Sequence, residues 1–198
     1  MHLNTQSTRT AEKALCDSDK VLRHLILRIG SCTLTEQPST PFETLVRSIV
    51  GQQLSGKAAS TIYARLTKLT GTIQSPSQFT GIADEDLRNT GLSARKTSCI
   101  RSLSQLEATG QLDFAHLESM HDDQIIDLLT RINGIGKWTA EMFLIFGLKR
   151  PDVLSLSDAG LQRSVRLLYG QEATLLETSK KWAPWRSVAS WYLWRNLD

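Results

Sequence analysis

Apolar residues recur every three or four positions along most of this 198-residue chain, which is the spacing of amphipathic helices. The first such run, from Leu15 to Ile29, ends at Gly30, a residue type that commonly follows a helix. No stretch alternates between apolar and polar residues for long enough to predict a strand. The pattern therefore predicts an all-α fold of about ten helices. The other helices are expected over residues 41–51, 55–71, 83–89, 93–110, 121–132, 137–146, 158–169 and 184–196, with a short helix at Ser75-Pro76.

Capping residues mark the starts of several of these helices. Thr40 and Glu43 enclose a proline in the pattern of an N-cap, a first-turn proline and a capping-box glutamate. Ser55 and Ser93 are further candidate N-caps. The clearest non-helical connector covers residues 147–157.

Composition and charge are those of an ordinary globular protein, with 40% apolar and 22% charged residues. The chain has 23 Lys+Arg against 20 Asp+Glu and no strongly basic segment, so charge alone does not indicate a nucleic-acid partner. The three cysteines lie far apart, which excludes a four-cysteine iron–sulfur set and favours a reduced, intracellular protein. The four histidines form no ligand set for catalytic zinc. We expect neither secretion nor membrane insertion, because no signal-like or membrane-length apolar run is present.

The most informative segment is the Asn-Gly-Ile-Gly-Lys-Trp motif that ends at Trp138. Gly134 and Gly136 allow a tight turn between two predicted helices and leave backbone N–H groups uncovered at the start of the second helix. Such N–H groups suit phosphate oxygens, and they would fix the protein on a duplex without reading its sequence. Taken alone, the motif is more often a plain tight turn between helices.

Five separated motifs follow one another along the chain: Ile49-Val-Gly-Gln-Gln-Leu-Ser55, Gly91-Leu-Ser-Ala-Arg-Lys96, Ile132-Asn-Gly-Ile-Gly-Lys-Trp-Thr-Ala-Glu-Met-Phe143, Arg150-Pro-Asp-Val153 followed by Asp158, and Pro184-Trp-Arg-Ser187. In this order they resemble the helix-hairpin-helix DNA glycosylase superfamily, and within it the 3-methyladenine DNA glycosylase II group, which removes alkylated bases. The resemblance implies a two-lobed all-α fold with a DNA-binding cleft between the lobes. Residues 1–40 with 150–198 would form one discontinuous helical lobe, and residues 41–149 would form the helix-hairpin-helix lobe.

The resemblance places the family's catalytic aspartate at Asp158. The position also fits on physical grounds, because it opens a predicted helix, where the helix dipole favours an ionised carboxylate. That carboxylate would stabilise the positive charge that develops on the sugar as the N-glycosidic bond breaks, and would orient or deprotonate the attacking water. Many relatives carry two aspartates here, whereas this chain has Ser157 before Asp158. Without the resemblance, Asp158 would more often be a plain helix cap.

Position 138 separates two enzyme types in this superfamily. Bifunctional members carry a lysine there, which attacks the sugar as an amine and cuts the strand through a Schiff base. This chain has Trp138, and the neighbouring Lys137 would point about 100° away on a helix. We therefore expect a monofunctional enzyme with water as the nucleophile and no strand-cleaving activity.

Aromatic residues are expected to hold the flipped base. The resemblance places Trp138 and Trp194 in the base pocket, where electron-rich rings would favour a cationic alkylated purine by about 1–2 kcal/mol. Two pocket positions that are often aromatic in bacterial members are Met142 and Ala159 here, so a roomier cavity is expected. The lesion preference is therefore left open.

DNA contacts are expected from the loop after residue 51, from the hairpin and from nearby cations. Gln53 stands where family members insert a wedge into the gap left by the flipped nucleotide, with Gln52 and Leu54 as competing candidates. Candidate backbone contacts are Gly134, Gly136, Lys137, Arg47, Lys57, Arg95 and Lys96, although isolated surface charges more often do nothing specific.

No cofactor is expected for the reaction. The resemblance alone implies a structural Na⁺ or K⁺ bound by the backbone carbonyls of Thr130, Ile132 and Ile135. Backbone ligands leave no side-chain signature in a sequence.

These observations together predict a monofunctional DNA glycosylase of the 3-methyladenine type that acts in base excision repair on damaged double-stranded DNA. A monomer is expected, cytoplasmic and nucleoid-associated in a bacterium or nuclear in a eukaryote. One alternative is a non-catalytic relative that binds abasic or distorted DNA; another is a helical interaction module with no affinity for DNA.

Overall fold

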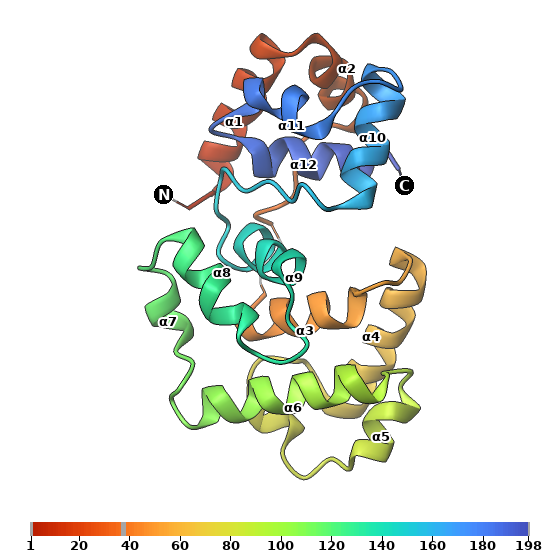
Figure 1. Ribbon diagram of the computed structural model, residues 1–198, viewed down its shortest axis with the longest axis vertical. Coiled ribbons are helices and arrows are strands. Elements are labelled where there is room, and N and C mark those ends of the chain that lie inside the picture. Colours follow the sequence, from red (N-terminus) through yellow and green to blue (C-terminus); the bar gives the residue numbers. More distant parts are fainter. Residues whose placement is uncertain (1, 37–38, 198) are drawn as a thin grey trace. The chain divides into compact units, whose positions relative to one another are not determined.

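The computed structural model describes residues 2–36 and 39–197, and within these ranges every regular element is helical (Figure 1). The predicted all-α fold is therefore confirmed. The chain divides into two compact units, Met1–Pro38 with Leu144–Asp198 and Ser39–Phe143. The lobe junctions predicted from the sequence, at 40/41 and 149/150, lie two and six residues further along the chain than these.

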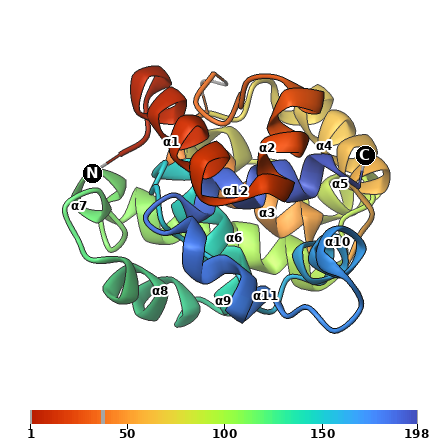
Figure 2. The same ribbon diagram turned by 90° about the horizontal axis from the view of Figure 1, so that it is seen from above.

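The first unit is built around its last helix. It contains α1 (Thr5–Ser18), α2 (Lys20–Ile29), α10 (Ala159–Tyr169), α11 (Leu175–Thr178), the 3-10 helix η3 (Ser179–Trp182) and α12 (Arg186–Arg195). Helix α12 is buried at seven successive positions from Ser187 to Leu193 and contacts α1, α2 and α10 (Figure 2). Small residues such as Ala189 and Ser190 let neighbouring helices approach α12 closely.

The apolar run before Gly30 forms two helices where the sequence analysis predicted one. The chain breaks at Asp19, whose backbone is extended and whose Oδ1 accepts hydrogen bonds from the N–H groups of Val21 (2.9 Å) and Leu22 (3.2 Å). Asp19 is thus the N-cap of α2, and a capping aspartate inside an apolar period is easily taken for an exposed helical position.

The second carboxylate oxygen of Asp19 ties three further side chains together. Oδ2 accepts hydrogen bonds from the Tyr169 hydroxyl (2.5 Å) and Trp182 Nε1 (2.8 Å), and it lies 3.1 Å from Lys181 Nζ. Burial alone would raise the pKa of Asp19, but hydrogen bonds, foremost from Trp182 and Tyr169, outweigh it and hold the pKa below its ordinary value. Asp19 therefore joins α2 to the end of α10 and to η3.

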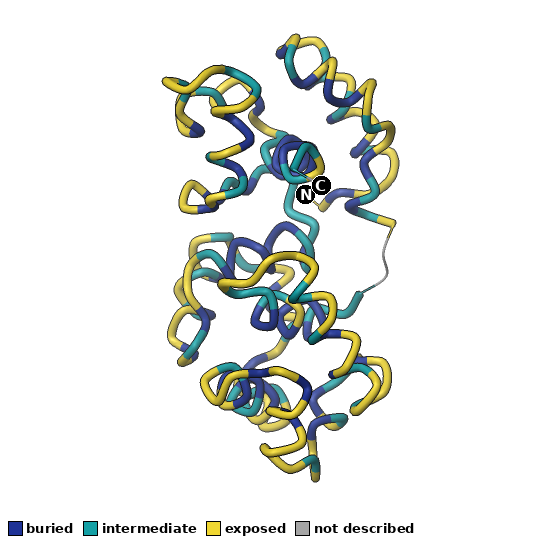
Figure 3. The backbone as a smooth tube through the Cα atoms, turned by 90° about the vertical axis from the view of Figure 1, so that its right-hand side faces the viewer, coloured by how far each residue is buried: buried dark blue, intermediate teal, exposed yellow. Residues whose placement is uncertain are grey.

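The second unit is built around α3 (Pro41–Gly51), which buries seven of its eleven residues and contacts α4, α6 and α9. Figure 3 shows buried and exposed positions alternating along the helices of this unit, as expected for amphipathic helices. Phe42 on α3 makes edge contacts with Phe79 and Phe114. The unit also contains α4 (Gly56–Thr70), the 3-10 helix η1 (Pro76–Phe79), α5 (Asp84–Asn89), α6 (Ala94–Ala108), α7 (Phe114–Leu117), α8 (Asp122–Thr130) and α9 (Lys137–Met142).

Three predicted N-caps are confirmed in this unit. The hydroxyls of Thr40, Ser55 and Ser93 each accept a hydrogen bond from the backbone N–H three residues later. The predicted role of Glu43 in a capping box is wrong: its carboxylate is buried and accepts hydrogen bonds from Arg47 and the Tyr63 hydroxyl.

The predicted helix over 137–146 also changes character partway. It begins as α9 and continues as a π-helical segment, η2 (Phe143–Gly147), which also contains the junction between the two units. Among the described residues, no helix is long and apolar enough to span a membrane.

Replacing Asp19 by Ala is expected to lower the free energy of unfolding by about 3 kcal/mol, because buried donors on Tyr169 and Trp182 lose their acceptor. Urea denaturation followed by circular dichroism measures this loss. Asp17→Ala is the matched control, since Asp17 is exposed and makes only a 3.7 Å ion pair with Arg23; it should change stability by less than about 0.5 kcal/mol.

Lowering the pH should reduce the difference in the free energy of unfolding between wild type and Asp19→Ala. A carboxyl with a lowered native pKa stabilises the fold above its unfolded pKa of about 3.9, and this stabilisation is lost as the pH falls through the native value. Denaturation at pH 7 and at pH 3 measures the change. A difference in the free energy of unfolding that grows toward low pH would contradict the lowered pKa of Asp19.

Candidate functional site

Asp158 is the N-cap of α10, as the sequence predicts for a capping residue. Its Oδ1 accepts hydrogen bonds from the Leu161 backbone N–H (2.8 Å) and from Trp194 Nε1 (3.1 Å). The residue is 8% exposed. The structure thus brings together Asp158 and Trp194, two of the predicted site residues, through a single carboxylate oxygen.

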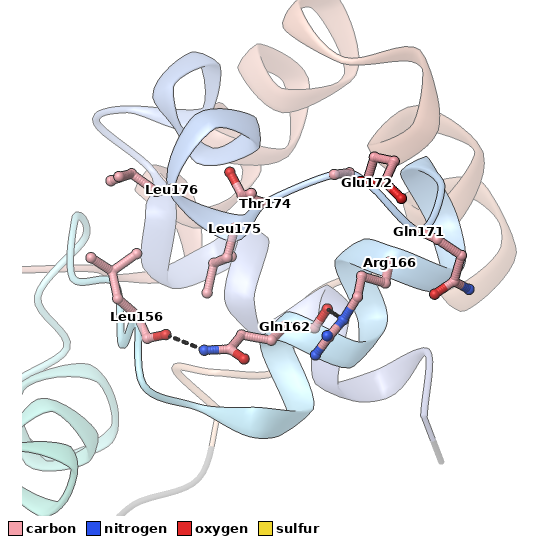
Figure 4. A pocket seen from close by; sticks show the side chains of 9 residues that line it. Leu156, Gln162, Arg166, Gln171, Glu172, Thr174, Leu175 and Leu176 are labelled. Carbon is pink, nitrogen blue, oxygen red and sulfur yellow. Dashed lines mark hydrogen bonds between the residues drawn. The ribbon is translucent and has the colours of Figure 1, made fainter.

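The connector that leads to Asp158 is fixed at several points within its own unit. Asp152 makes a bidentate ion pair with Arg186, with contacts of 2.6 and 2.7 Å, and the Val153 N–H donates to Ser187 Oγ. Nearer to Asp158, Gln162 Nε2 donates to the Leu156 carbonyl at 2.8 Å (Figure 4). Because α10 and α12 both hold the connector, the carboxylate sits on a rigid support.

The cavity in Figure 4 is a separate feature of the same unit. It has a volume of about 470 Å³ and is lined by Leu156, Arg166, Leu175 and neighbouring residues. Neither Asp158 nor Trp194 lines it. The cavity is therefore not the predicted base pocket.

Two residues near Asp158 were missed by the sequence analysis. The Phe146 ring lies against Trp194 with a centroid distance of 5.5 Å. A Cβ at Gly160 would lie 3.1 Å from Asp158 Oδ1 and 3.4 Å from Trp194 Cδ1, so a side chain there would press on this pair. A glycine in the first turn of a predicted helix lowers helix stability, and this was the signal in the sequence that marked Gly160.

The other predicted pocket residues differ in placement. Ala159 is exposed at the first position of α10. Trp138 is half-buried and Met142 is 4% exposed, and both lie on α9 in the second unit. Their predicted place around a base beside Asp158 stays a prediction.

The hairpin between α8 and α9 has the tight geometry that the glycines indicated. The Ile135 N–H donates to the Ile132 carbonyl (3.0 Å), and both side chains are buried. Gly134 has φ +96°, and a Cβ there would lie 2.8 Å from Cys99 Cβ. Gly136 is the N-cap of α9, with open space where a Cβ would stand.

The cation site implied by the resemblance stays a prediction. The Ile132 carbonyl already accepts the Ile135 hydrogen bond, and Thr130 is exposed at the end of α8. Among the described residues, no group of three His, Cys, Asp or Glu could hold a metal ion.

The loop after α3 presents the predicted wedge candidates differently. Gln53 and Leu54 are exposed. Gln52 instead turns its amide toward the hairpin, where Nε2 donates to the Gly134 carbonyl and to Thr139 Oγ1, both at 2.9 Å.

The predicted DNA-contacting cations also separate into two groups. Lys57, Arg95 and Lys137 are exposed. Arg47 is also exposed, but it is bound to Glu43 and lies 3.8 Å from the Tyr63 ring centroid. Lys96 Nζ donates to the Val50 and Gln52 carbonyls.

A helical hairpin closed by Gly-x-Gly and followed along the chain by a helix-capping aspartate is the arrangement expected of a helix-hairpin-helix DNA repair protein. The sequence pattern of the family described as "HhH-GPD superfamily base excision DNA repair protein" matches residues 46–186. This chain belongs to that superfamily.

Individual relatives match most of the chain. The Schizosaccharomyces pombe protein named DNA-3-methyladenine glycosylase 1 is 31% identical over 96% of this chain and 88% of its own. A crystal structure of DNA-3-methyladenine glycosidase from Bacillus halodurans is 44% identical over 93% of this chain and 88% of that chain, with a TM-score of 0.75. The S. pombe 3-methyladenine DNA glycosylase in complex with abasic DNA has a TM-score of 0.82 at 31% identity, over 94% and 95% of the two chains.

Gly134→Ala is expected to destabilise the second unit by about 2 kcal/mol or more, because the new Cβ meets Cys99 and the backbone is left-handed. Gly136→Ala is the matched control: its φ is −96° and its surroundings are open, so stability should change by less than about 0.5 kcal/mol. Thermal unfolding of both variants compares them. Equal losses would contradict the tight contact at Gly134.

Proposed function

We propose that this protein is a monofunctional DNA glycosylase that flips an alkylated purine of the 3-methyladenine type out of duplex DNA and hydrolyses its N-glycosidic bond. The observation that carries the proposal is the Asp158 carboxylate, held by a helix N–H and an indole N–H at the start of α10. The names of the relatives, which act on 3-methyladenine in DNA, support the substrate class.

The chemistry asks little of the protein beyond charge and position. An N-alkylated purine carries a positive charge and departs as a neutral base, so no strong general acid is required. Asp158 supplies negative charge beside the sugar as it becomes cationic, and it orients or deprotonates the water that attacks the anomeric carbon. Its support by Leu161 and Trp194 fixes the carboxylate before the substrate arrives.

Aromatic rings supply selectivity for the damaged base. In this proposal, Trp138 and Trp194 stack on the flipped purine, and a cationic base gains about 1–2 kcal/mol over a neutral one. Met142 and Ala159 leave more room than aromatic residues would at the same positions, which favours a broad range of alkylated purines. Duplex DNA is the partner, and the protein acts as a monomer.

Water is the nucleophile in this proposal. The tryptophan at position 138 offers no amine, and the neighbouring Lys137 is exposed and lies 4.0 Å from Glu141. The released product is then a free base and an intact strand with an abasic site.

Asp158→Asn should lower the rate of base release by about 100-fold or more, because the amide removes the charge and keeps an acceptor for Leu161. Single-turnover release of free methylated purine from a methylated duplex measures the rate. Ser157→Ala, at the exposed neighbouring position, is the matched control and should retain the wild-type rate.

Two outcomes would contradict this mechanism. If Asp158→Asn released the base at the wild-type rate, the carboxylate would have no part in the reaction. Tight binding of wild type to an abasic duplex with no base release would instead favour a non-catalytic DNA-binding protein, an alternative suggested by the relative solved on abasic DNA.

Borohydride reduction during the reaction should trap no covalent protein–DNA complex, because no amine attacks the sugar. Gel electrophoresis under denaturing conditions detects such a complex, and a bifunctional glycosylase run in parallel shows that the trap works. A trapped complex that disappears in Lys137→Ala would assign lyase chemistry to Lys137.

A further inference from the structure

Three residues, Gln52, Gln53 and Leu54, join α3 to the N-cap of α4, and we call them the wedge turn. Gln53 has φ +56°, a left-handed conformation that is uncommon for residues with a Cβ. Such a conformation persists only where the surrounding structure holds it. Within the turn itself, the Leu54 N–H donates to the Gly51 carbonyl (3.2 Å).

Lys96 holds the wedge turn from one side. Its ammonium donates to the Val50 and Gln52 carbonyls, both at 2.8 Å. Carbonyls at the end of a helix lack intrahelical partners and carry the negative end of the helix dipole, so a cation there satisfies both needs. Burial also lowers the pKa of Lys96, in keeping with a side chain turned into the protein.

Gln52 holds the wedge turn from the other side. Its amide nitrogen donates to the Gly134 carbonyl in the hairpin and to Thr139 Oγ1 on α9. These partners are far from Gln52 in the sequence, and one of them belongs to the Gly-x-Gly motif. The wedge turn is therefore bonded to α6 through Lys96 and to the hairpin through Gln52.

We propose that Lys96 and Gln52 are positioning residues, which lock the wedge turn to the hairpin so that backbone binding and wedge insertion occur as one rigid step. This inference rests on the proposed function, because it takes the wedge turn to fill the gap left by a flipped base. In this inference Gln53 and Leu54 contact the DNA, whereas Gln52 and Lys96 do not. A turn ordered in advance avoids the entropy cost of ordering it during flipping.

Salt dependence separates a positioning role from a phosphate contact. A side chain that neutralises one phosphate contributes about 0.9 to the slope of log affinity against log salt concentration, whereas a positioning residue contributes nothing to this slope. Lys96→Met keeps most of the length of the side chain and removes its charge. Arg95→Met, at the exposed neighbouring position, is the contrast, because Arg95 is a predicted phosphate contact.

The experiment measures two properties of each variant on a duplex with 2-aminopurine beside an abasic site. One is the salt slope of binding, and the other is the fluorescence change at saturating protein, which reports unstacking in the bound complex. Lys96→Met and Gln52→Leu should keep the wild-type salt slope and lose most of the fluorescence change. Arg95→Met should lower the slope by about 0.9 and keep the fluorescence change. Lys96→Arg should regain part of the fluorescence change that Lys96→Met loses, because a guanidinium can also donate to two carbonyls.

Several results would overturn the inference. Lys96→Met would be a phosphate contact if its salt slope fell like that of Arg95→Met while the fluorescence change remained. A loss of fluorescence change that Lys96→Arg cannot restore, with Gln52→Leu unaffected, would also contradict it. Gln52→Leu provides an independent test if Lys96→Met does not fold. The readout needs no base release, so an inactive protein that still unstacks DNA would refute the proposed reaction and leave the positioning role intact.

Discussion

The candidate site depends on one oxygen atom, Asp158 Oδ1, which accepts hydrogen bonds from a helix N–H and from an indole N–H. Both donors are neutral, so neither hydrogen bond brings a positive charge to the carboxylate. They also fix its direction, since the Leu161 N–H belongs to the α10 backbone and Trp194 to buried α12. Gly160 has no side chain that would separate the carboxylate from the indole.

The same chain carries a second aspartate in an almost identical local setting. Asp19 also caps a helix and also accepts a tryptophan Nε1, but the indole donates to Oδ2, which also accepts the Tyr169 hydroxyl and lies 3.1 Å from the Lys181 ammonium. All of these contacts lie within one unit and join three of its elements, so the work of Asp19 is structural.

Local signals in the sequence predicted much of the fold, and long-range contacts account for the rest. The N-caps Thr40, Ser55 and Ser93 could be predicted because an N-cap bond joins residues only three positions apart. Single-turn helices such as α7 and α11 were missed because one turn is too short to show an apolar period.

The candidate site was predictable to the same extent. The positions of Asp158 and of the hairpin glycines follow from motifs. The family resemblance added Trp194 to the same predicted site as Asp158. The partners of Gln52 and Lys96 did not follow, because an amide in a loop and an ammonium in the first turn of a helix give no sign of which distant carbonyls they bind. These contacts depend on how α3, α6 and the hairpin pack together.

The close approach of Gly134 to Cys99 has a chemical consequence. Burial raises the pKa of the Cys99 thiol to about 11, with Arg95 opposing it only in part. At neutral pH only about one thiol in ten thousand is ionised, and the thiolate is the reactive nucleophile. The Cys99 sulfur beneath the hairpin is therefore a poor nucleophile at neutral pH, both because it is buried and because it is almost entirely protonated.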